Sequence, residues 1–333
     1  MYRNEDLNFK IDFVVTWVDG SDEKWLQKKN QFKLDGDGGN IRYRDFGIFK
    51  YWFRAVEKFA PWVNKVYLVT DNQIPSWLNI SCSKLQVIDH KDIIPKDALP
   101  TFNSNAIELN VRNIKGLEEH FVLFNDDMFL NAVVKPSDFF SRNGLPKDCA
   151  VQNAIMPVED FDHITANNIA IVNQNVNKKT VLKSKFTQFF NLKYSYYNIL
   201  SILLLPWPRF TRFLDPHIPI SLLKSEFNRV AKNNFEEFDN TTHSRFRSRT
   251  DISFWLVRYF QLVNGCFSPR SPKFGEKYNV DQFVKIVKDI RKSKHKVICI
   301  NDVQLDSITF IKVRKKLRET YQEVLTEKSD FEM

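Results

Sequence analysis

The triplet Asn125-Asp126-Asp127 is the strongest chemical signal in the sequence. It ends a continuous apolar run, His120–Asn125, which we predict to be a buried strand. Adjacent carboxylates repel each other unless a cation neutralises them, and carboxylate oxygens suit hard ions. We therefore predict that Asp126 and Asp127 hold a divalent metal, Mg²⁺ or Mn²⁺. The alternative is that one aspartate caps the following turn while the other is solvated.

A second acidic turn, Asp19-Gly20-Ser21-Asp22, follows another apolar run near the start of the chain. Its backbone amides and the Ser21 hydroxyl could receive a phosphate or a ribose at a helix N-terminus. The alternative is an ordinary N-cap, in which Ser21 or Asp22 begins the helix that contains Trp25. Both interpretations place a helix directly after this turn.

Two later segments hold residues suited to proton transfer and phosphate binding. His217, in Asp215-Pro216-His217, titrates near neutrality and could take a proton from a hydroxyl. Arg245 and Arg247 stand at alternate positions and offer planar, bidentate donors for phosphate oxygens. The alternatives are a structural histidine beside proline and a solvated basic loop.

Strands and helices alternate over the first 140 residues. This alternation predicts a mostly parallel α/β sheet, in which ligands bind beyond the carboxyl ends of the strands. Neither a G-x-G-x-x-G motif nor a Walker-type phosphate loop follows any strand. We expect strands at Ile11–Trp17, Lys65–Thr70, Leu85–Asp89 and His120–Asn125, with helices over Asp45–Phe59 and Asn103–Gly116.

The pattern becomes less regular after residue 150. Residues 160–215 are rich in Asn, Lys and Phe, which predicts a helical insertion or lid. An in-plane membrane contact through Trp207, Arg209 and Arg212 is the alternative. We also expect residues 221–263 and 311–327 to be helical by their spacing, and one more buried strand at Lys296–Asn301.

Composition and charge narrow the class of protein. In 333 residues, 43% are hydrophobic and 27% are charged, which excludes disorder as the main state. The net charge of +9 lies entirely in the second half, since residues 1–150 carry −1 and residues 151–333 carry +10. We expect the second half to meet something anionic, although a solubilising surface is an equal alternative.

The cellular compartment is also suggested by the sequence. The four cysteines are far apart, so neither a zinc knuckle nor a disulfide framework is indicated. The charged N-terminus lacks the apolar core of a signal peptide, and the longest apolar run, Ile199–Leu205, is too short to span a bilayer. We therefore expect a cytoplasmic protein.

Taken together, these segments resemble the Stealth family of sugar-1-phosphate transferases, which includes bacterial capsular polysaccharide phosphotransferases and the catalytic subunit of the lysosomal-enzyme N-acetylglucosamine-1-phosphotransferase. One departure is Val111-Arg112-Asn113, where the family pattern leads us to expect a histidine, and residues 141–214 match no family block. The resemblance lies, in order, in Ile11–Trp25; in Arg42–Asp45, Phe59–Leu78, Leu99–Val111 and Phe121–Leu130; in Asp215–Phe227 and Ser244–Asp251; and in Cys299–Asp302.

The resemblance implies a reaction and a set of roles. A hexose or hexosamine 1-phosphate would move from a UDP-sugar to an acceptor hydroxyl, forming a phosphodiester and releasing UMP, in capsular or cell-surface polysaccharide synthesis. His217 would be the base, with Asp302 the next candidate and a possible further ligand of the ion. The alternatives are a glycosyltransferase that releases UDP and a non-enzymatic polyanion-binding module. The implied set is completed by Arg245 and Arg247 for phosphate, by Asp126 and Asp127 for Mg²⁺ or Mn²⁺, and by Asp19, Gly20, Ser21, Arg44, Asn103 and Asn105 for the nucleotide sugar.

The predicted fold is α/β, with a mostly parallel, Rossmann-like (glycosyltransferase-A-like) sheet and a helical insertion. Residues 1–150 would form the α/β part that binds nucleotide sugar and metal, 151–214 a variable insertion or lid, and 215–333 a basic helical part that completes the active site. The expected partners are a UDP-sugar and a polysaccharide or glycan acceptor, without nucleic acid. Peripheral association with the inner face of the bacterial membrane stays open, as does the oligomeric state.

Overall fold

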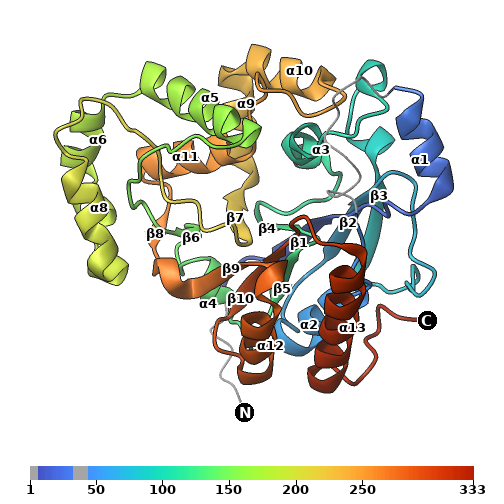
Figure 1. Ribbon diagram of the computed structural model, residues 1–333. Coiled ribbons are helices and arrows are strands. Elements are labelled where there is room, and N and C mark those ends of the chain that lie inside the picture. Colours follow the sequence, from blue (N-terminus) through green and yellow to red (C-terminus); the bar gives the residue numbers. More distant parts are fainter. Residues whose placement is uncertain (1–6, 33–43) are drawn as a thin grey trace.

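A five-stranded sheet forms the centre of the molecule (Figure 1) in a computed structural model that describes residues 7–32 and 44–333. The strand order is β3–β2–β1–β4–β7. Four strands run parallel, and β7 pairs antiparallel with β4. The predicted mostly parallel α/β sheet is therefore confirmed. The strands are β1 (Ile11–Thr16), β2 (Val66–Thr70), β3 (Leu85–Asp89), β4 (His120–Asn125) and β7 (Ile220–Leu223).

The register of the central strands decides where the acidic motifs lie. β1 and β4 pair from Ile11 beside His120 to Thr16 beside Asn125. β1 is buried except at Thr16, and β4 is buried except at its two ends, because helices cover both faces of the sheet. The turn after β1 and the pair Asp126-Asp127 after β4 consequently leave the sheet at the same edge.

Alternating residues of β1 supply the two cores of the fold. Phe13 and Val15 pack on the face covered by α2, α12 and α13, whereas Val14 packs on the face covered by α3, α5, α9, α10 and α11. Figure 1 shows these groups below and above the sheet. The helices are α1 (Glu23–Asn30), α2 (Phe49–Phe59), α3 (Ser104–Asn110), α4 (Pro136–Phe139), α5 (Asp160–Asn175), α6 (Lys178–Ser184), α7 (Phe186–Phe189), α8 (Asn198–Leu203), α9 (Lys224–Asn233), α10 (Phe235–His243), α11 (Trp255–Asn264), α12 (Phe283–Lys292) and α13 (Ser307–Val324).

A second sheet joins the C-terminal part of the chain to the segment after β4. Its strands are β5 (Met128–Leu130), β10 (Val297–Asn301) and β9 (Gly275–Asn279), with β10 in the middle. β10 pairs antiparallel with β5, so that Cys299 lies opposite Met128. The strand predicted at Lys296–Asn301 is thus confirmed, and it lies next to the acidic pair. A third, two-stranded sheet joins β6 (Lys147–Asp148) to β8 (Ser268–Pro269).

Strand β7 corrects the prediction that residues 221–263 are helical. The run Ile220–Leu223 is too short for its spacing to distinguish a strand from a helix, and pairing with the edge of β4 decides for the strand. Because β7 runs antiparallel to β4, the residues just before Ile220 lie at the carboxyl end of β4. This pairing brings His217 to the edge of the sheet that carries the acidic residues.

Other boundaries differ by a few residues. The helix predicted from Asp45 begins at Phe49, because Gly47 has a φ of +65°, which is outside the helical region. The helix predicted to Gly116 ends at Asn110 and continues as one 3₁₀ turn.

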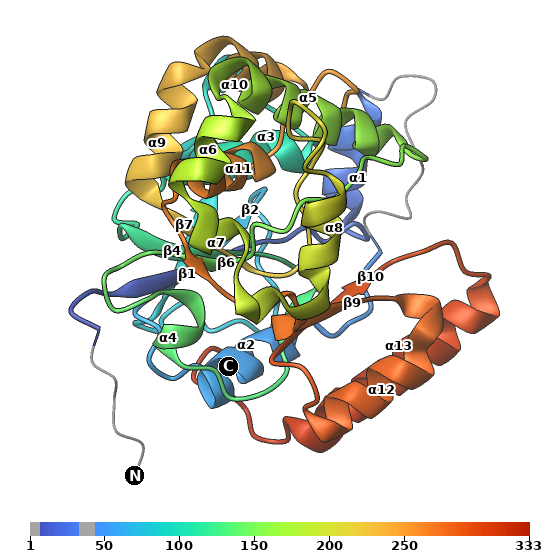
Figure 2. The same cartoon turned by 90° about the vertical axis from the view of Figure 1, so that its left-hand side faces the viewer.

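The predicted helical insertion is present as α5 to α8. Helices α6 and α8 form a column along one side of the molecule (Figure 1), and that side faces the viewer in Figure 2. None of the described helices is long and apolar enough to cross a membrane.

Candidate active site

Three side chains from distant parts of the chain meet at the carboxyl end of β4. Asp127 Oδ2 accepts a hydrogen bond from Cys299 Sγ at 3.2 Å and lies 3.8 Å from His217 Nε2. The backbone supports this meeting, because Ile300 N donates to Asp127 O at 2.8 Å. The structure therefore brings together the predicted base and one predicted metal ligand, and adds a thiol that no local pattern indicated.

The two adjacent aspartates have opposite electrostatic surroundings. Asp126 reaches the surface, but the protein around it still desolvates its carboxylate and disfavours the charged form. Repulsion from Asp127 and Asp45 adds to this effect, and the pKa of Asp126 rises to about 8. Enclosure alone would also raise the pKa of Asp127, but His217 and Cys299 outweigh this effect and bring it below its usual range. Asp127 is thus the carboxylate that stays ionised.

Glu108, on α3, is a further acidic residue beneath this edge. It is 3% exposed, and burial raises its pKa to about 8, while Arg247 and a hydrogen bond from Asn125 act in the other direction. No motif in the sequence marks it as a site residue. One signal could have found it: Glu108 shares the buried side of α3 with Asn105 and Leu109, and a charged residue on a buried helix face is unusual.

The oxygen atoms at this edge fit a divalent cation. Asp127 Oδ1 and Asn125 Oδ1 are both buried and lack a hydrogen-bond partner among the described residues. Buried oxygens without partners are costly, and hard cations take such carboxylate and amide oxygens as ligands. Burial is the main reason for the raised pKa values of Asp126 and Glu108, and repulsion from Asp127 adds to it at both residues, so a cation beside Asp127 would favour their ionised forms.

A buried arginine anchors the turn that carries His217. Arg258 is 0% exposed and donates two hydrogen bonds to Asp148, at 2.7 and 2.9 Å, and one to Asp215 at 2.7 Å. Asp215 also accepts from the Tyr259 hydroxyl at 2.7 Å. His217, two residues later, has a φ of +48°, which non-glycine residues seldom adopt. The network therefore holds the strained residue in place.

The predicted arginine segment lies across α3. Arg245 Nε donates to Pro100 O at 2.9 Å, and its guanidinium lies 4.2 Å from the centre of the Phe32 ring. Arg247 Nη2 donates to Ser104 Oγ at 2.6 Å. Arg247 also acts electrostatically on Glu108, which places it on the side of the acidic group.

Asn103 and Asn105 lie beneath that segment and are buried. Asn103 Nδ2 donates to Asp251 Oδ2 at 2.7 Å and to Ser244 O at 3.0 Å, and Asn105 Nδ2 lies 3.4 Å from the same Asp251 oxygen. These contacts position the loop that carries the arginines. A direct contact of the two amides with a nucleotide sugar stays a prediction.

The turn after β1 folds onto itself. Asp19 Oδ1 accepts from the Ser21 amide at 2.8 Å and from its hydroxyl at 2.6 Å, and Gln73 bonds the Asp19 backbone. Asp22 is the N-cap of α1, as one of the two sequence interpretations held. Gly20 completes this turn, and ligand binding by Asp19, Gly20 and Ser21 stays a prediction.

Arg44 and Asp302 pair with each other. Arg44 Nε and Nη2 donate to the two carboxylate oxygens of Asp302 at 2.9 and 2.7 Å, and Nη2 also donates to Val303 O. Burial nevertheless outweighs the arginine and raises the pKa of Asp302. The pair connects the segment after β10 to the residues before α2. Nucleotide-sugar binding by Arg44 and a role of Asp302 as base or metal ligand stay predictions.

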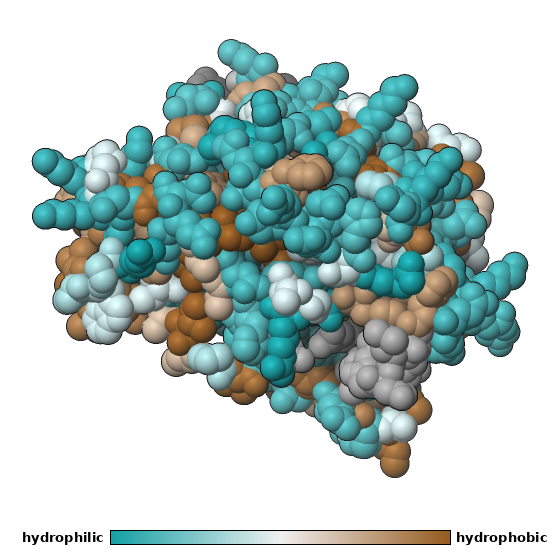
Figure 3. All heavy atoms as spheres, turned by 90° about the horizontal axis from the view of Figure 1, so that it is seen from above, coloured by the Kyte–Doolittle hydropathy of each residue, from teal (hydrophilic) through white to brown (hydrophobic). Residues whose placement is uncertain are grey.

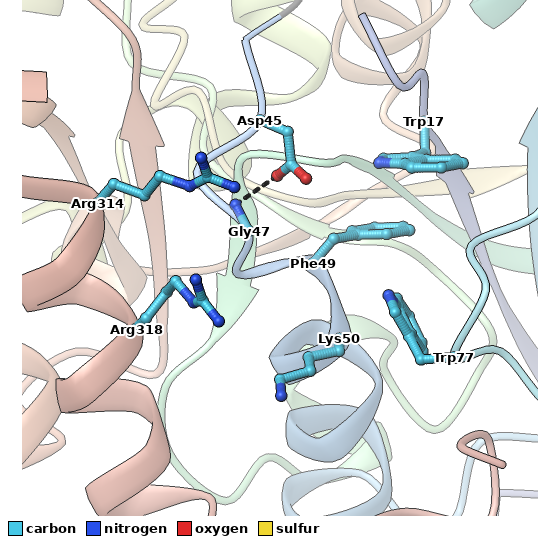
Figure 4. Close-up of a pocket in the computed structure, with 8 residues that line it drawn as sticks. All are labelled: Trp17, Asp45, Gly47, Phe49, Lys50, Trp77, Arg314 and Arg318. Atoms are coloured by element: carbon cyan, nitrogen blue, oxygen red, sulfur yellow. Dashed lines mark hydrogen bonds between the residues drawn. The ribbon is translucent and has the colours of Figure 1, made fainter. Parts of the chain in front are cut away.

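A cavity of about 230 Å³ opens beside the turn after β1. Figure 4 shows three aromatic rings on one side of it and basic side chains of α2 and α13 on the other. Trp17 stacks on Phe49 with ring centres 5.3 Å apart. Asp45 connects the cavity to the acidic pair, because its charge helps to raise the pKa of Asp126. The lining consists of Trp17, Asp45, Gly47, Phe49, Lys50, Trp77, Arg314 and Arg318.

The carboxylates and the imidazole lie at the carboxyl ends of the parallel strands, the edge at which α/β enzymes bind their ligands. Two family models match the chain: Stealth protein CR1, conserved region 1, over residues 9–37, and Stealth protein CR2, conserved region 2, over residues 42–148. The chain belongs to the Stealth family and is a phosphotransferase.

Curated relatives extend this similarity over almost the whole chain. The exopolysaccharide phosphotransferase cps2G of Lactiplantibacillus plantarum is 60% identical over 97% of this chain and 96% of its own. The capsular polysaccharide phosphotransferase WcwK of Streptococcus pneumoniae is 43% identical over 97% and 98%. The receptor polysaccharide phosphotransferase WefC of Streptococcus gordonii is 40% identical over 97% and 99%. Among solved structures, the galactosyltransferase LgtC aligns over 94% of this chain and 95% of its own with 8% identity and a TM-score of 0.36.

Proposed function

We propose that this phosphotransferase moves a hexose or hexosamine 1-phosphate from a UDP-sugar to an acceptor hydroxyl of a capsular or cell-surface polysaccharide. The products would be a phosphodiester and UMP. The observation that carries the proposal is the meeting of His217 with Asp127, 3.8 Å apart, at the sheet edge that also carries Asp126. The polysaccharide phosphotransferases to which the chain is similar support the acceptor class.

The proposed reaction takes place at phosphorus. The acceptor oxygen attacks the β-phosphorus of the donor and UMP leaves, so the C1–O bond of the sugar stays intact. Phosphoryl transfer of this kind needs positioning and neutralisation of charge more than covalent participation by the protein. A site made of an imidazole, arginines and carboxylates meets both needs.

His217 would accept the proton of the acceptor hydroxyl. The carboxylate of Asp127, close to Nε2, stabilises the imidazolium that results. Because Arg258 and Asp215 fix the turn before it, the ring is held at one place on the edge of the sheet. As the base, His217 would thereby be positioned before any substrate arrives.

Arg247 would bind phosphate oxygens, with Arg245 beside it on the same segment. The contact of Arg247 with Ser104 and its electrostatic effect on Glu108 direct it toward the acidic residues rather than into solvent. A planar guanidinium can bind two phosphate oxygens at once, which fixes the orientation of a diphosphate.

Asp126 and Asp127 would hold the divalent cation, Mg²⁺ or Mn²⁺, near the unpaired oxygen of Asn125. Such an ion neutralises charge on a diphosphate. The cavity beside Asp45 would take the nucleotide, since its aromatic rings suit a base and Lys50, Arg314 and Arg318 suit phosphates.

Replacement of His217 by alanine tests the proposal. We expect turnover to fall by roughly two to four orders of magnitude while UDP-sugar binding survives, because the cation and the arginines remain. His163→Ala, an exposed histidine on α5, is the matched control and should leave turnover unchanged. Unchanged turnover of His217→Ala would contradict the assignment of the base.

A further inference from the structure

Nearly half of the exposed large hydrophobic side chains of the described chain gather on the helical insertion. One of them, Leu192, is 96% exposed. A concentration of this kind marks a contact surface, whereas single exposed apolar residues are ordinary. This set, the insertion patch, consists of Phe186, Leu192, Tyr196, Ile199, Leu200, Ile202, Leu203, Leu205 and Trp207.

The insertion patch begins at Phe186 on α7, continues through the segment before α8 and α8 itself, and ends at Trp207 just after α8. Figure 2 shows these helices in front of the molecule, and in Figure 3 hydrophobic side chains are exposed at the left margin, beside a mostly hydrophilic upper face. The patch is separate from the cavity next to Asp45, whose lining contains no residue of the insertion.

Polar contacts from beneath hold the patch in its exposed position. Ser201 is the buried residue of α8, and its hydroxyl accepts a hydrogen bond from Gln152 N at 2.9 Å. Lys178 Nζ donates to Leu204 O at 2.6 Å and to Trp207 O at 3.0 Å. The apolar side chains are therefore presented outward by an ordered support.

The charged side chains of the insertion itself have one sign, although Glu276 of β9 lies close enough to act on Tyr197. Residues 163–214 contain no aspartate or glutamate but include seven lysines and arginines. Lys193 and Arg209 are exposed within this stretch, and Lys273 lies 5.0 Å from the centre of the Tyr196 ring. A binding partner of the patch must therefore be complementary to exposed apolar side chains and to nearby positive charge.

We propose that the insertion patch docks on the surface of a bilayer that contains anionic phospholipid. Exposed Leu and Ile would enter the acyl boundary, Trp207 and Tyr196 would lie at the headgroup level, and the basic side chains would meet lipid phosphates. A second copy of this chain fits less well, because a two-fold contact would oppose the same basic stretch to itself.

Vesicle sedimentation tests the proposal on the full-length protein. We expect binding to vesicles of mixed phosphatidylglycerol and phosphatidylcholine, weaker binding in 0.5 M NaCl, and little binding to phosphatidylcholine alone. The triple variant Ile199→Gln, Leu203→Gln, Trp207→Gln should bind at least about tenfold more weakly. Lys193→Gln and Arg209→Gln should each weaken binding about fivefold.

The matched control replaces three equally exposed apolar residues elsewhere, Ile80→Gln, Phe235→Gln and Val284→Gln. It should bind vesicles like the wild type. The proposal is overturned if the wild type ignores anionic vesicles, or if the patch variant binds them as well as the control does. A wild type that dimerises without lipid, with a monomeric patch variant and no vesicle binding by either, would assign the patch to a second copy instead.

Discussion

Glu108 offers a test of how strongly burial beneath the proposed site disfavours a carboxylate charge. Its pKa is about 8 in the folded protein, compared with an ordinary value of 4.5. Between these values the folded chain keeps a proton that the unfolded chain releases, so the free energy of unfolding must fall as pH rises. From pH 5 to pH 8 the loss attributable to this one carboxyl group is about 3 kcal/mol.

Glu108→Gln removes this titration while keeping the size of the side chain. We expect the variant to be about as stable as the wild type at pH 5 and more stable by about 3 kcal/mol at pH 8, because glutamine never acquires the buried charge. Urea denaturation at both pH values, without divalent ions, measures the difference. The control is Glu327→Gln, an exposed glutamate, which should follow the wild type at both pH values. If Glu108→Gln and the wild type lose stability in parallel from pH 5 to pH 8, the inference that Glu108 is buried and protonated is wrong.

Three further substitutions probe the metal, the phosphate contact and the anchor of the catalytic turn. Asp127→Asn should keep the fold but lower turnover, measured as the rate of product release, by at least about a hundredfold. Full activity of the wild type in EDTA would contradict the metal role. Arg247→Lys keeps the charge but loses the planar fork, so kcat/KM should fall strongly, and a wild-type value would make the segment a basic surface only. Arg258→Leu should lower the free energy of unfolding by about 3–5 kcal/mol, because Asp148 and Asp215 lose their buried partner. Replacing both aspartates by asparagine in that background should restore much of the loss, as urea denaturation would show.

The parts of the site that were predictable lie next to each other in the sequence. The apolar run before Asn125 and the acidic pair after it define a strand and its carboxyl end in one local pattern, and the structure confirms the strand. The same holds for the run before Asp19, where Asp22 caps the following helix.

The remaining features depend on pairing between distant segments. Cys299 reaches Asp127 only because β10 pairs with β5, and His217 reaches it only because β7 pairs with β4. Neither pairing has a signature in the local sequence, and the four residues of β7 do not distinguish a strand from a helix. The cavity was missed for the same reason, since it joins Trp17 to Arg314 across most of the chain.

Identification of the released nucleotide is the decisive test of the proposed sugar-1-phosphate transfer. The purified protein would be incubated with a panel of UDP-sugars, Mg²⁺ or Mn²⁺ and an acceptor glycan, and the nucleotide and the new linkage would be identified by chromatography and mass spectrometry. We expect UMP in equal amount to a new phosphodiester, with both lost in His217→Ala. Release of UDP with a new glycosidic bond would show glycosyl transfer, and binding of glycans without any turnover would show a binding module; either result would contradict the account.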